Sequence, residues 1–204
     1  KVKLNIFSEL EKISFELNKR RNNAIPKFKN QISKILSNLG MSSSKFKIEI
    51  SKTNKFKLNG SDTISFEFAS NKGSSFKDLK KIASGGELSR IMFSIKIILS
   101  RFKSLPTIIF DEIDTGTSGD ISTKIARLML EMSKTMQVLV ISHSPQVASI
   151  GDNHIKVYKD SSKNNTVTKL KLLNSKERII EIADMLGGGS ESLTAVQHAK
   201  QLLN

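Results

Sequence analysis

Apolar residues recur at helical spacing over the first 39 residues of the chain. Mostly lysine, arginine and amide side chains stand between them, so a helix here carries one apolar stripe on a polar surface. Two interpretations are open: an arm of a coiled coil whose partner lies upstream of this chain, or a bundle helix packed on the domain. The spacing predicts a helix that ends near Gly40. The stripe consists of Ile6, Leu10, Ile13 and Leu17 and continues with Ile25, Phe28, Ile32, Ile35 and Leu39.

From Lys45 to Ser70 the apolar period changes to two. Phenylalanine and isoleucine alternate with lysine, glutamate and serine, which predicts short antiparallel strands with one buried face. Asn59-Gly60, between two of the apolar runs, predicts a tight turn. Interleaved phenylalanine and lysine also occur on surfaces that stack single-stranded nucleic acid, but we favour the buried sheet face as the explanation.

Two apolar runs farther along the chain, 108–110 and 137–141, predict strands that are buried on both faces. A helix predicted over 121–132 lies between them. The order strand, helix, strand predicts a βαβ unit in which the two strands are parallel neighbours. Further strands are predicted over 154–158 and 166–172, and further helices over 177–186 and from a cap at Ser190 or Ser192 to Leu203.

Polar side chains follow both apolar strands without a spacer. Asp111 and Glu112 come directly after the first strand, and His143 comes two residues after the second. Ligands of such sheets bind outside the carboxyl ends of parallel strands, so these three side chains are candidates for one catalytic site. The alternatives are an acidic loop after a core strand and a structural histidine.

The segment ASGGELSR, residues 83–90, predicts the start of a further helix. Ser84 is a candidate N-cap, and Glu87 three residues later completes a capping-box pattern. Gly85 and Gly86 lower helix propensity in the first turn, where capping alone does not require glycine. A helix N-terminus with free N–H groups and no Cβ bulk suits an anion such as a terminal phosphate.

Composition narrows the picture further. The chain has 33 lysines and arginines against 19 aspartates and glutamates, and the net charge of +14 favours a polyanion such as DNA, although a lysine-rich solvated surface also explains the scattered lysines. The lack of cysteine excludes disulfides and thiolate metal sites. Apolar runs fall short of the roughly 20 residues that span a bilayer. The start, without Met or a signal-peptide core, predicts a piece of a longer polypeptide, and the lack of cysteine is compatible with a cytoplasmic protein.

Three motifs, in this order, resemble those of ABC-type ATPases. ASGGELSR looks like the signature motif, TIIFDEID at 107–114 like the Walker B strand, and Ser142-His143 like the switch-histidine loop. The details FDEIDTGTSGD, SHSPQVAS and a terminal LGG before a helix resemble the carboxyl-terminal half of the RecN family. This family groups bacterial DNA repair ATPases related to the structural maintenance of chromosomes (SMC) proteins. The resemblance covers nearly the whole chain.

The fold that this resemblance implies is α/β. It is the carboxyl-terminal lobe of an ABC/SMC-type ATPase head, a P-loop NTPase-like sheet with flanking helices, together with a small antiparallel β region and an N-terminal coiled-coil arm helix. The implied domains are the arm at 1–40 and the head lobe at 41–204. Within the lobe, antiparallel strands occupy 41–82, and the core with the three motifs occupies 83–204.

The resemblance also implies a role for each motif in ATP hydrolysis. Glu112 and His143 would be catalytic, the first orienting the attacking water and the second contacting the γ-phosphate, and Asp111 would hold Mg²⁺ through water. The signature residues would bind the ATP of an opposing head in a homodimer, and an interface loop would follow Walker B. These residues are Ser84, Gly85 and Gly86 in the signature, and Gly116 and Ser118 in the loop. ATP would join two heads and hydrolysis would release them, in recombinational repair of DNA double-strand breaks at the bacterial nucleoid.

Two features depart from the family pattern. Gly116-Thr117-Ser118 stands where related heads carry an aspartate, and the sequence has no GxxxxGK[ST] motif. In this family the P-loop lies in the amino-terminal half, so the resemblance implies that this half is a partner and that the chain alone is inactive. The alternatives are a non-enzymatic dimerisation or DNA-bridging module and, in another class, the nucleotide-binding domain of an ABC transporter.

Overall fold

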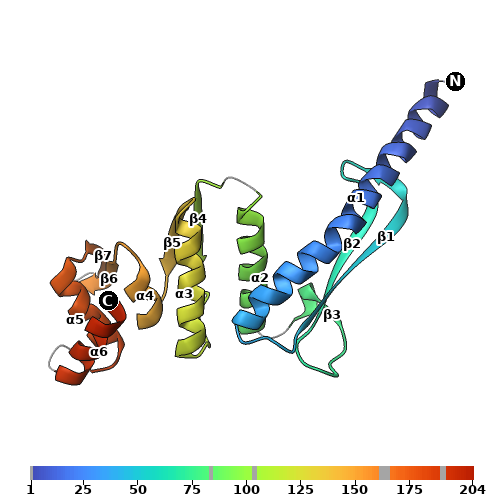
Figure 1. Cartoon of the computed structure of the whole chain (residues 1–204). Helices are drawn as coiled ribbons and strands as arrows, with labels where there is room; N and C mark the ends of the chain where they lie inside the picture. Colours follow the sequence, from blue (N-terminus) through green and yellow to red (C-terminus); the bar gives the residue numbers. More distant parts are fainter. Residues whose placement is uncertain (1, 83–84, 103–104, 161–165, 189–191) are drawn as a thin grey trace. The chain divides into compact units, whose positions relative to one another are not determined.

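The computed structural model describes residues 2–82, 85–102, 105–160, 166–188 and 192–204 (Figure 1). The chain forms two compact units, Lys1–Phe102 and Lys103–Asn204, and each is described by itself. The arm at 1–40 and the head lobe at 41–204 stay predictions about domains. In the described ranges, no helix is both long and apolar enough to cross a membrane.

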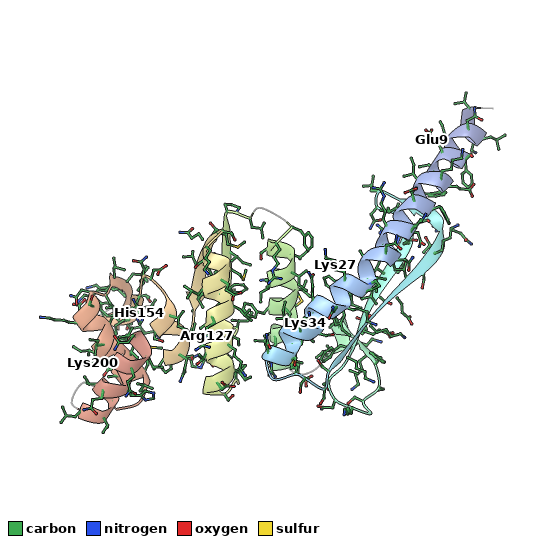
Figure 2. All side chains as sticks on the ribbon, viewed as in Figure 1. Glu9, Lys27, Lys34, Arg127, His154 and Lys200 are labelled. Carbon is green, nitrogen blue, oxygen red and sulfur yellow. The ribbon has the colours of Figure 1, made fainter. Side chains whose placement is uncertain are left out.

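The first unit is built on the helix α1, Val2–Asn38, which confirms the predicted helix and continues through Pro26. Its second half is packed: Ile32 and Leu36 are fully buried. In the first half the apolar stripe is largely exposed, with Ile6 at 53% and Ile13 at 61%. Side chains project from α1 along its whole length (Figure 2). The helix therefore packs as a bundle helix at its carboxyl end, whereas Ile6, Leu10 and Ile13 of its amino-terminal stripe are exposed.

Two long antiparallel strands lie along α1 (Figure 1). They are β1, Lys45–Lys57, and β2, Gly60–Ala69, joined by a turn in which Gly60 has φ +96°. Phe46 pairs with Phe68, and both rings are buried, which confirms that the alternating phenylalanines form a buried sheet face. The prediction of several short strands is wrong, because β1 continues through the polar residues 51–55 on its way to the turn.

The first unit closes with a short strand, a 3-10 helix and one longer helix. The strand β3, Lys77–Asp78, pairs with β2, and the 3-10 helix η1, Leu79–Lys81, follows it. The helix α2, Gly85–Ser100, then packs on α1. Its buried side chains include Ile91, Ser94 and Ile98, which lie on one face because residues three, four and seven apart share a helix face.

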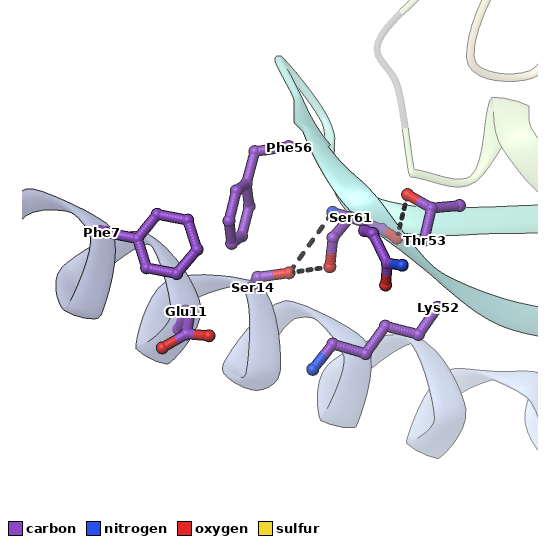
Figure 3. A pocket seen from close by; sticks show the side chains of 8 residues that line it. Phe7, Glu11, Ser14, Lys52, Thr53, Phe56 and Ser61 are labelled. Carbon is purple, nitrogen blue, oxygen red and sulfur yellow. Dashed lines mark hydrogen bonds between the residues drawn. The ribbon is translucent and has the colours of Figure 1, made fainter.

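A polar contact ties α1 to the hairpin of β1 and β2. Asp62 on β2 accepts hydrogen bonds from Arg21 at 2.8 Å and from Asn18 at 2.9 Å, and its side chain is only 1% exposed. Nearer the tip, Ser14 bonds with Ser61 beside a small pocket (Figure 3). The pocket is lined by Phe7, Glu11, Ser14, Lys52, Thr53, Asn54, Phe56 and Ser61. The hairpin is thus fixed to the helix by polar as well as apolar contacts.

The second unit contains the predicted βαβ arrangement. The strands β4, Thr107–Asp111, and β5, Gln137–Ile141, are parallel neighbours, and the helix α3, Gly119–Ser133, connects them. The short helix α4, Pro145–Ile150, follows β5 and was not predicted. Ser144 at its N-cap and Pro145 at its first position are the sequence signal for it.

The prediction that β4 and β5 are buried on both faces is wrong for the described residues. Ile108 and Phe110 are buried, but Ile109 between them is 57% exposed, and on β5 Leu139 and Ile141 are 44% and 56% exposed. Since alternate residues of a strand point to opposite faces, one face of this two-stranded sheet is packed and the other is open. Continuous apolar strands of this kind normally have cover on both faces.

The chain ends in a hairpin and two helices. The strands β6, Ile155–Asp160, and β7, Val167–Leu172, are antiparallel, as the alternation predicts in type and place. The helix α5, Ser175–Met185, begins with a capping box between Asn174 and Glu177. Ser192 caps the last helix, α6, Leu193–Leu203, by accepting from the amide of Ala195. Ile182 and Ala199 are fully buried between α5 and α6.

Candidate active site at the ends of β4 and β5

Glu112 adopts an uncommon backbone conformation directly after β4. Its φ is +46°, the left-handed region that non-glycine residues rarely enter. Its amide donates to the carbonyl of Ile141 on β5 at 2.9 Å, and its own carbonyl accepts from Thr115. The chain therefore turns sharply at Glu112 while it is still bonded to the neighbouring strand. Such backbone strain persists where surrounding contacts hold it, and it is typical of functional sites.

The three side chains predicted to share a site lie at one edge of the sheet. Asp111 is the last residue of β4 and pairs in register with Ile141, and His143 follows Ile141 by two residues. Asp111, Glu112 and His143 are all exposed. The prediction that the carboxylates and the imidazole follow neighbouring parallel strands is thus confirmed. Their catalytic roles stay predictions.

Asp114 connects the segments that carry Glu112 and His143. It is 4% exposed, and its Oδ2 accepts a hydrogen bond of 2.6 Å from Ser142 Oγ. Ser142 Oγ in turn accepts from the amide of Ser144 at 2.9 Å. The sequence reasoning missed Asp114. The sequence feature that could have pointed to it is that Asp114 is the third carboxylate after this strand and follows the buried Ile113.

The predicted interface loop is fixed at Thr117. The carbonyl of Asp114 accepts from the Thr117 hydroxyl at 2.7 Å and from the Thr117 amide at 3.2 Å. The same hydroxyl is 2.8 Å from that of Ser122 on α3. Gly116 has φ +71°, and Ser118 is the N-cap of α3 but makes no side-chain cap bond there. The exposed Gly116 and Ser118 therefore flank Thr117, which is held in place by its hydrogen bonds.

The signature segment opens α2 in the first unit. Gly85 and Gly86 occupy its first turn as predicted, and a Cβ at Gly85 would meet open space. Ser84 lies outside the described residues, so its capping and phosphate-binding roles stay predictions. Arg90 donates to the carbonyls of Gly86 and Leu39, each at 3.1 Å. This arginine, which the sequence reasoning left without a role, joins the start of α2 to the end of α1.

The carboxylates at the end of β4 suit Mg²⁺, which keeps several water ligands, better than a metal ion that is coordinated only by protein side chains. Among the described residues, no three or more histidine, aspartate or glutamate side chains are grouped to hold a metal ion. Mg²⁺ keeps several waters and usually takes one or two carboxylates together with substrate phosphates. The exposed carboxylate of Asp111 fits that mode of binding, which would supply charge neutralisation at a nucleotide phosphate.

Comparison with known proteins finds relatives of the chain. No family model matches the chain. It is 37% identical over 193 residues to the DNA repair protein RecN of Rickettsia typhi, which covers 95% of this chain and 35% of that protein. It is 33% identical over 199 residues to RecN of Haemophilus influenzae, covering 97% of this chain and 36% of the relative. The chain is homologous to RecN. This RecN homologue spans about a third of the length of the curated relatives that it matches.

Solved SMC heads share the fold of the RecN homologue. The Smc head domain of Pyrococcus yayanosii, with a coiled coil and joint, has a TM-score of 0.65 at 19% identity and covers 91% of this chain and 33% of that one. A structure from work on ATP-driven dimerization and DNA-stimulated activation of SMC ATPases has a TM-score of 0.51 at 22% identity, with 76% and 91% coverage. At these identities the likeness shows the fold alone. It confirms a mixed α/β SMC-head fold with a long N-terminal helix.

Proposed function

We propose that this chain is the carboxyl-terminal lobe of an SMC-like ATPase head that acts in recombinational repair of DNA double-strand breaks. One observation carries the proposal. The parallel strands β4 and β5 place Asp111, Glu112 and His143 at one sheet edge, with Glu112 held in a strained turn by Ile141. The homology to RecN supports DNA repair as the setting, in the bacterial cytoplasm at the nucleoid.

In this proposal each residue of the edge has one task in ATP hydrolysis. Glu112 orients and polarises the attacking water, because its carboxylate is exposed and its backbone is fixed. His143 contacts the γ-phosphate region as a hydrogen-bond donor. Asp111 holds Mg²⁺ through water. Phosphoryl transfer depends mainly on positioning and charge stabilisation, which is what a rigid strand end supplies.

The proposed site needs two further contributors. An amino-terminal half of the same protein would supply the P-loop, and its strands would cover the open face of β4 and β5, where Ile109, Leu139 and Ile141 are exposed. A second head would present its own signature residues, Ser84, Gly85 and Gly86, to the bound ATP, so that ATP joins two heads and hydrolysis releases them. Gly116 and Ser118 would lie at that interface.

The proposal predicts that ATP turnover requires the amino-terminal half. The 204-residue chain alone should hydrolyse ATP no faster than a buffer blank, because it lacks the backbone cradle that holds the β- and γ-phosphates. Addition of the separately produced amino-terminal half should restore turnover. Phosphate release measured for each half and for the mixture checks this. Robust turnover by this chain alone would refute the proposal. Stable pairing of the halves without turnover would favour the non-enzymatic bridging alternative.

A basic stripe on α1 supports DNA as a partner. Its lysines lie seven, eight and seven residues apart, which places them within about 80° of one another around the helix. All four are exposed, and the buried Ser14 and Ile32 lie on the opposite side, toward the hairpin and α2. The stripe consists of Lys12, Lys19, Lys27 and Lys34; Figure 2 labels the last two.

Removal of the charges of this stripe should lower the affinity for DNA. It should also make that affinity less sensitive to salt concentration. With all four lysines changed to glutamine, the slope of log K against log salt should fall by about one for each lysine that contacts a phosphate. Fluorescence anisotropy of the 204-residue chain with labelled duplex DNA, over a salt series, measures this. A control with the same charge loss changes Lys134, Lys159, Lys176 and Lys200 in the second unit to glutamine. Equal slopes for the two variants would show that only net charge matters.

The two alternative functions make different predictions. A transporter nucleotide-binding domain would need a membrane partner, and the relatives and solved structures compared above, which are RecN proteins and SMC heads, give that alternative no support. A DNA-bridging module without turnover would bind DNA through the α1 stripe and be indifferent to substitution of Glu112. The ATPase measurements therefore separate the functions.

A further inference from the structure

The peptide on each side of His143 is held by one hydrogen-bonded chain of side chains. Ser142, before the histidine, donates its hydroxyl proton to Asp114 Oδ2 at 2.6 Å. Ser144, after the histidine, donates its amide proton to Ser142 Oγ at 2.9 Å. Both bonds converge on the same serine oxygen, and that oxygen is bonded to the buried Asp114. The exposed His143 side chain is therefore carried by a short segment, Ser142 to Ser144, that is hydrogen-bonded to the Asp114 carboxylate directly at Ser142 and through Ser142 at Ser144.

The same residue also fixes the loop that follows Glu112. The Asp114 carbonyl accepts from the amide and the hydroxyl of Thr117, and the Glu112 carbonyl accepts from Thr115. Asp114 thus belongs to the turn that begins at Glu112 and reaches across to the loop of His143. The backbone bond between Glu112 and Ile141 aligns the strands, but it lies before Ser142 and leaves the histidine segment to be positioned by Asp114.

From this geometry we infer that Asp114 is a positioning residue that sets His143 relative to Glu112. The inference rests on the proposed function, in which both side chains act on one ATP. Asp114 does not reach the reacting atoms itself, since it is buried and bonds through Ser142. It acts by holding the two loops in a single arrangement, which is how supporting hydrogen bonds keep catalytic groups in productive geometry.

The unpaired second oxygen of Asp114 argues against a purely structural link. Asp114 Oδ1 is buried and has no hydrogen-bond partner within the described residues. An unsatisfied buried acceptor destabilises a fold, so a carboxylate is a poor choice if its only purpose is to join two loops. A carboxylate does serve to orient the Ser142 hydroxyl, because it can only accept and so forces that proton toward itself and the oxygen lone pairs toward Ser144.

Four variants test the inference in two preparations. Asp114→Ala and Ser142→Ala each remove the link, and Asp114→Asn keeps an oxygen that can accept from Ser142. Asp120→Ala on α3 is the control, because its carboxylate is exposed and pairs with Lys124 on the same helix. Amide exchange by NMR on the 204-residue chain reports the position of the loop, and steady-state ATPase kinetics on the complete protein report its use.

The link should show in both measurements. Asp114→Ala and Ser142→Ala should abolish protection of the Ser144 amide in the chain and lower kcat about 100-fold in the complete protein, with KM for ATP little changed. Asp114→Asn should keep most of the Ser144 protection and most of the wild-type kcat, and Asp120→Ala should change neither quantity. Ser142→Ala keeps the test valid if Asp114→Ala fails to fold.

Two results would overturn the inference. One is unchanged protection of Ser144 in Ser142→Ala, which would mean that the bond does not hold the loop. The other is a kcat equal to the control when protection is lost, which would mean that the loop position does not matter to turnover. Lack of turnover in the wild-type complete protein would instead refute the proposed function, and the exchange data would still report on the link.

Discussion

Replacement of Glu112 by glutamine in the complete protein should lower kcat for ATP hydrolysis at least about 100-fold while ATP binding is retained. Glutamine keeps the size of the side chain but removes the charge that polarises the attacking water, and loss of a general base typically lowers rates by about 10² to 10⁴. ATP binding should persist because the phosphates are held elsewhere in the proposed site. Single-turnover hydrolysis and nucleotide binding, measured on the same preparation, separate the two effects.

The backbone at Glu112 offers a second, independent variant. Glycine adopts φ +46° without strain, so Glu112→Gly should relieve the strain of the turn while removing the carboxylate. It should be as inactive as Glu112→Gln and no less stable than wild type. Glu131→Gln on α3, an exposed site, is the matched control for the loss of one charge. Hydrolysis by Glu112→Gln at the wild-type rate would refute the assigned role.

The strand ends were predictable because their signal is local. Apolar runs that stop abruptly at Asp111 and at Ser142 mark where two strands leave the core, and a helix between them makes the strands parallel neighbours. Parallel strands end at the same edge, so the placement of Glu112 and His143 at one sheet edge followed from chain order alone. The same reasoning placed Gly85 in the first turn of α2.

Other features depend on contacts that a sequence does not encode in a local pattern. The open face at Ile109 was missed because an apolar run looks the same whether or not another layer covers it within the chain. Asp114 was missed because its partner, Ser142, lies 28 residues away. The positive φ of Glu112 could not be predicted from the residue type, since glutamate is rarely found in the left-handed region of backbone conformation.

Asp62 should contribute most of the polar stabilisation of the first unit. Its carboxylate is nearly fully buried and bonds to Arg21 and Asn18, whereas the Arg21 side chain is 20% exposed. Asp62→Ala removes one partner of a buried ion pair, which typically costs about 3 to 5 kcal/mol. We expect the lower end, about 3 kcal/mol, because Arg21 can be partly rehydrated. Urea unfolding followed by circular dichroism measures the change in free energy.

Glu49→Ala on the same hairpin is the control. Glu49 pairs with Lys47, but its side chain is 49% exposed, so its removal should change the free energy of unfolding by less than about 1 kcal/mol. A loss of less than about 1 kcal/mol in both variants would mean that the hairpin is held by its apolar face alone. In that case the packing of Phe46 against Phe28 of α1, and not the Asp62 contact, would join the hairpin to the helix.

The dependence of stability on pH provides a further test of the Asp62 contact. Burial by itself raises the pKa of Asp62, but the hydrogen bonds from Arg21 and Asn18 together outweigh it, so the pKa lies below its ordinary value of 3.8. A carboxyl whose pKa is lower in the folded state stabilises the fold above the unfolded pKa, and this contribution is lost as pH falls through the folded value. The stability gap between wild type and Asp62→Asn should therefore be constant near neutral pH and narrow below about pH 4. A gap that stays constant into acid would show that the Asp62 charge does not stabilise the folded state.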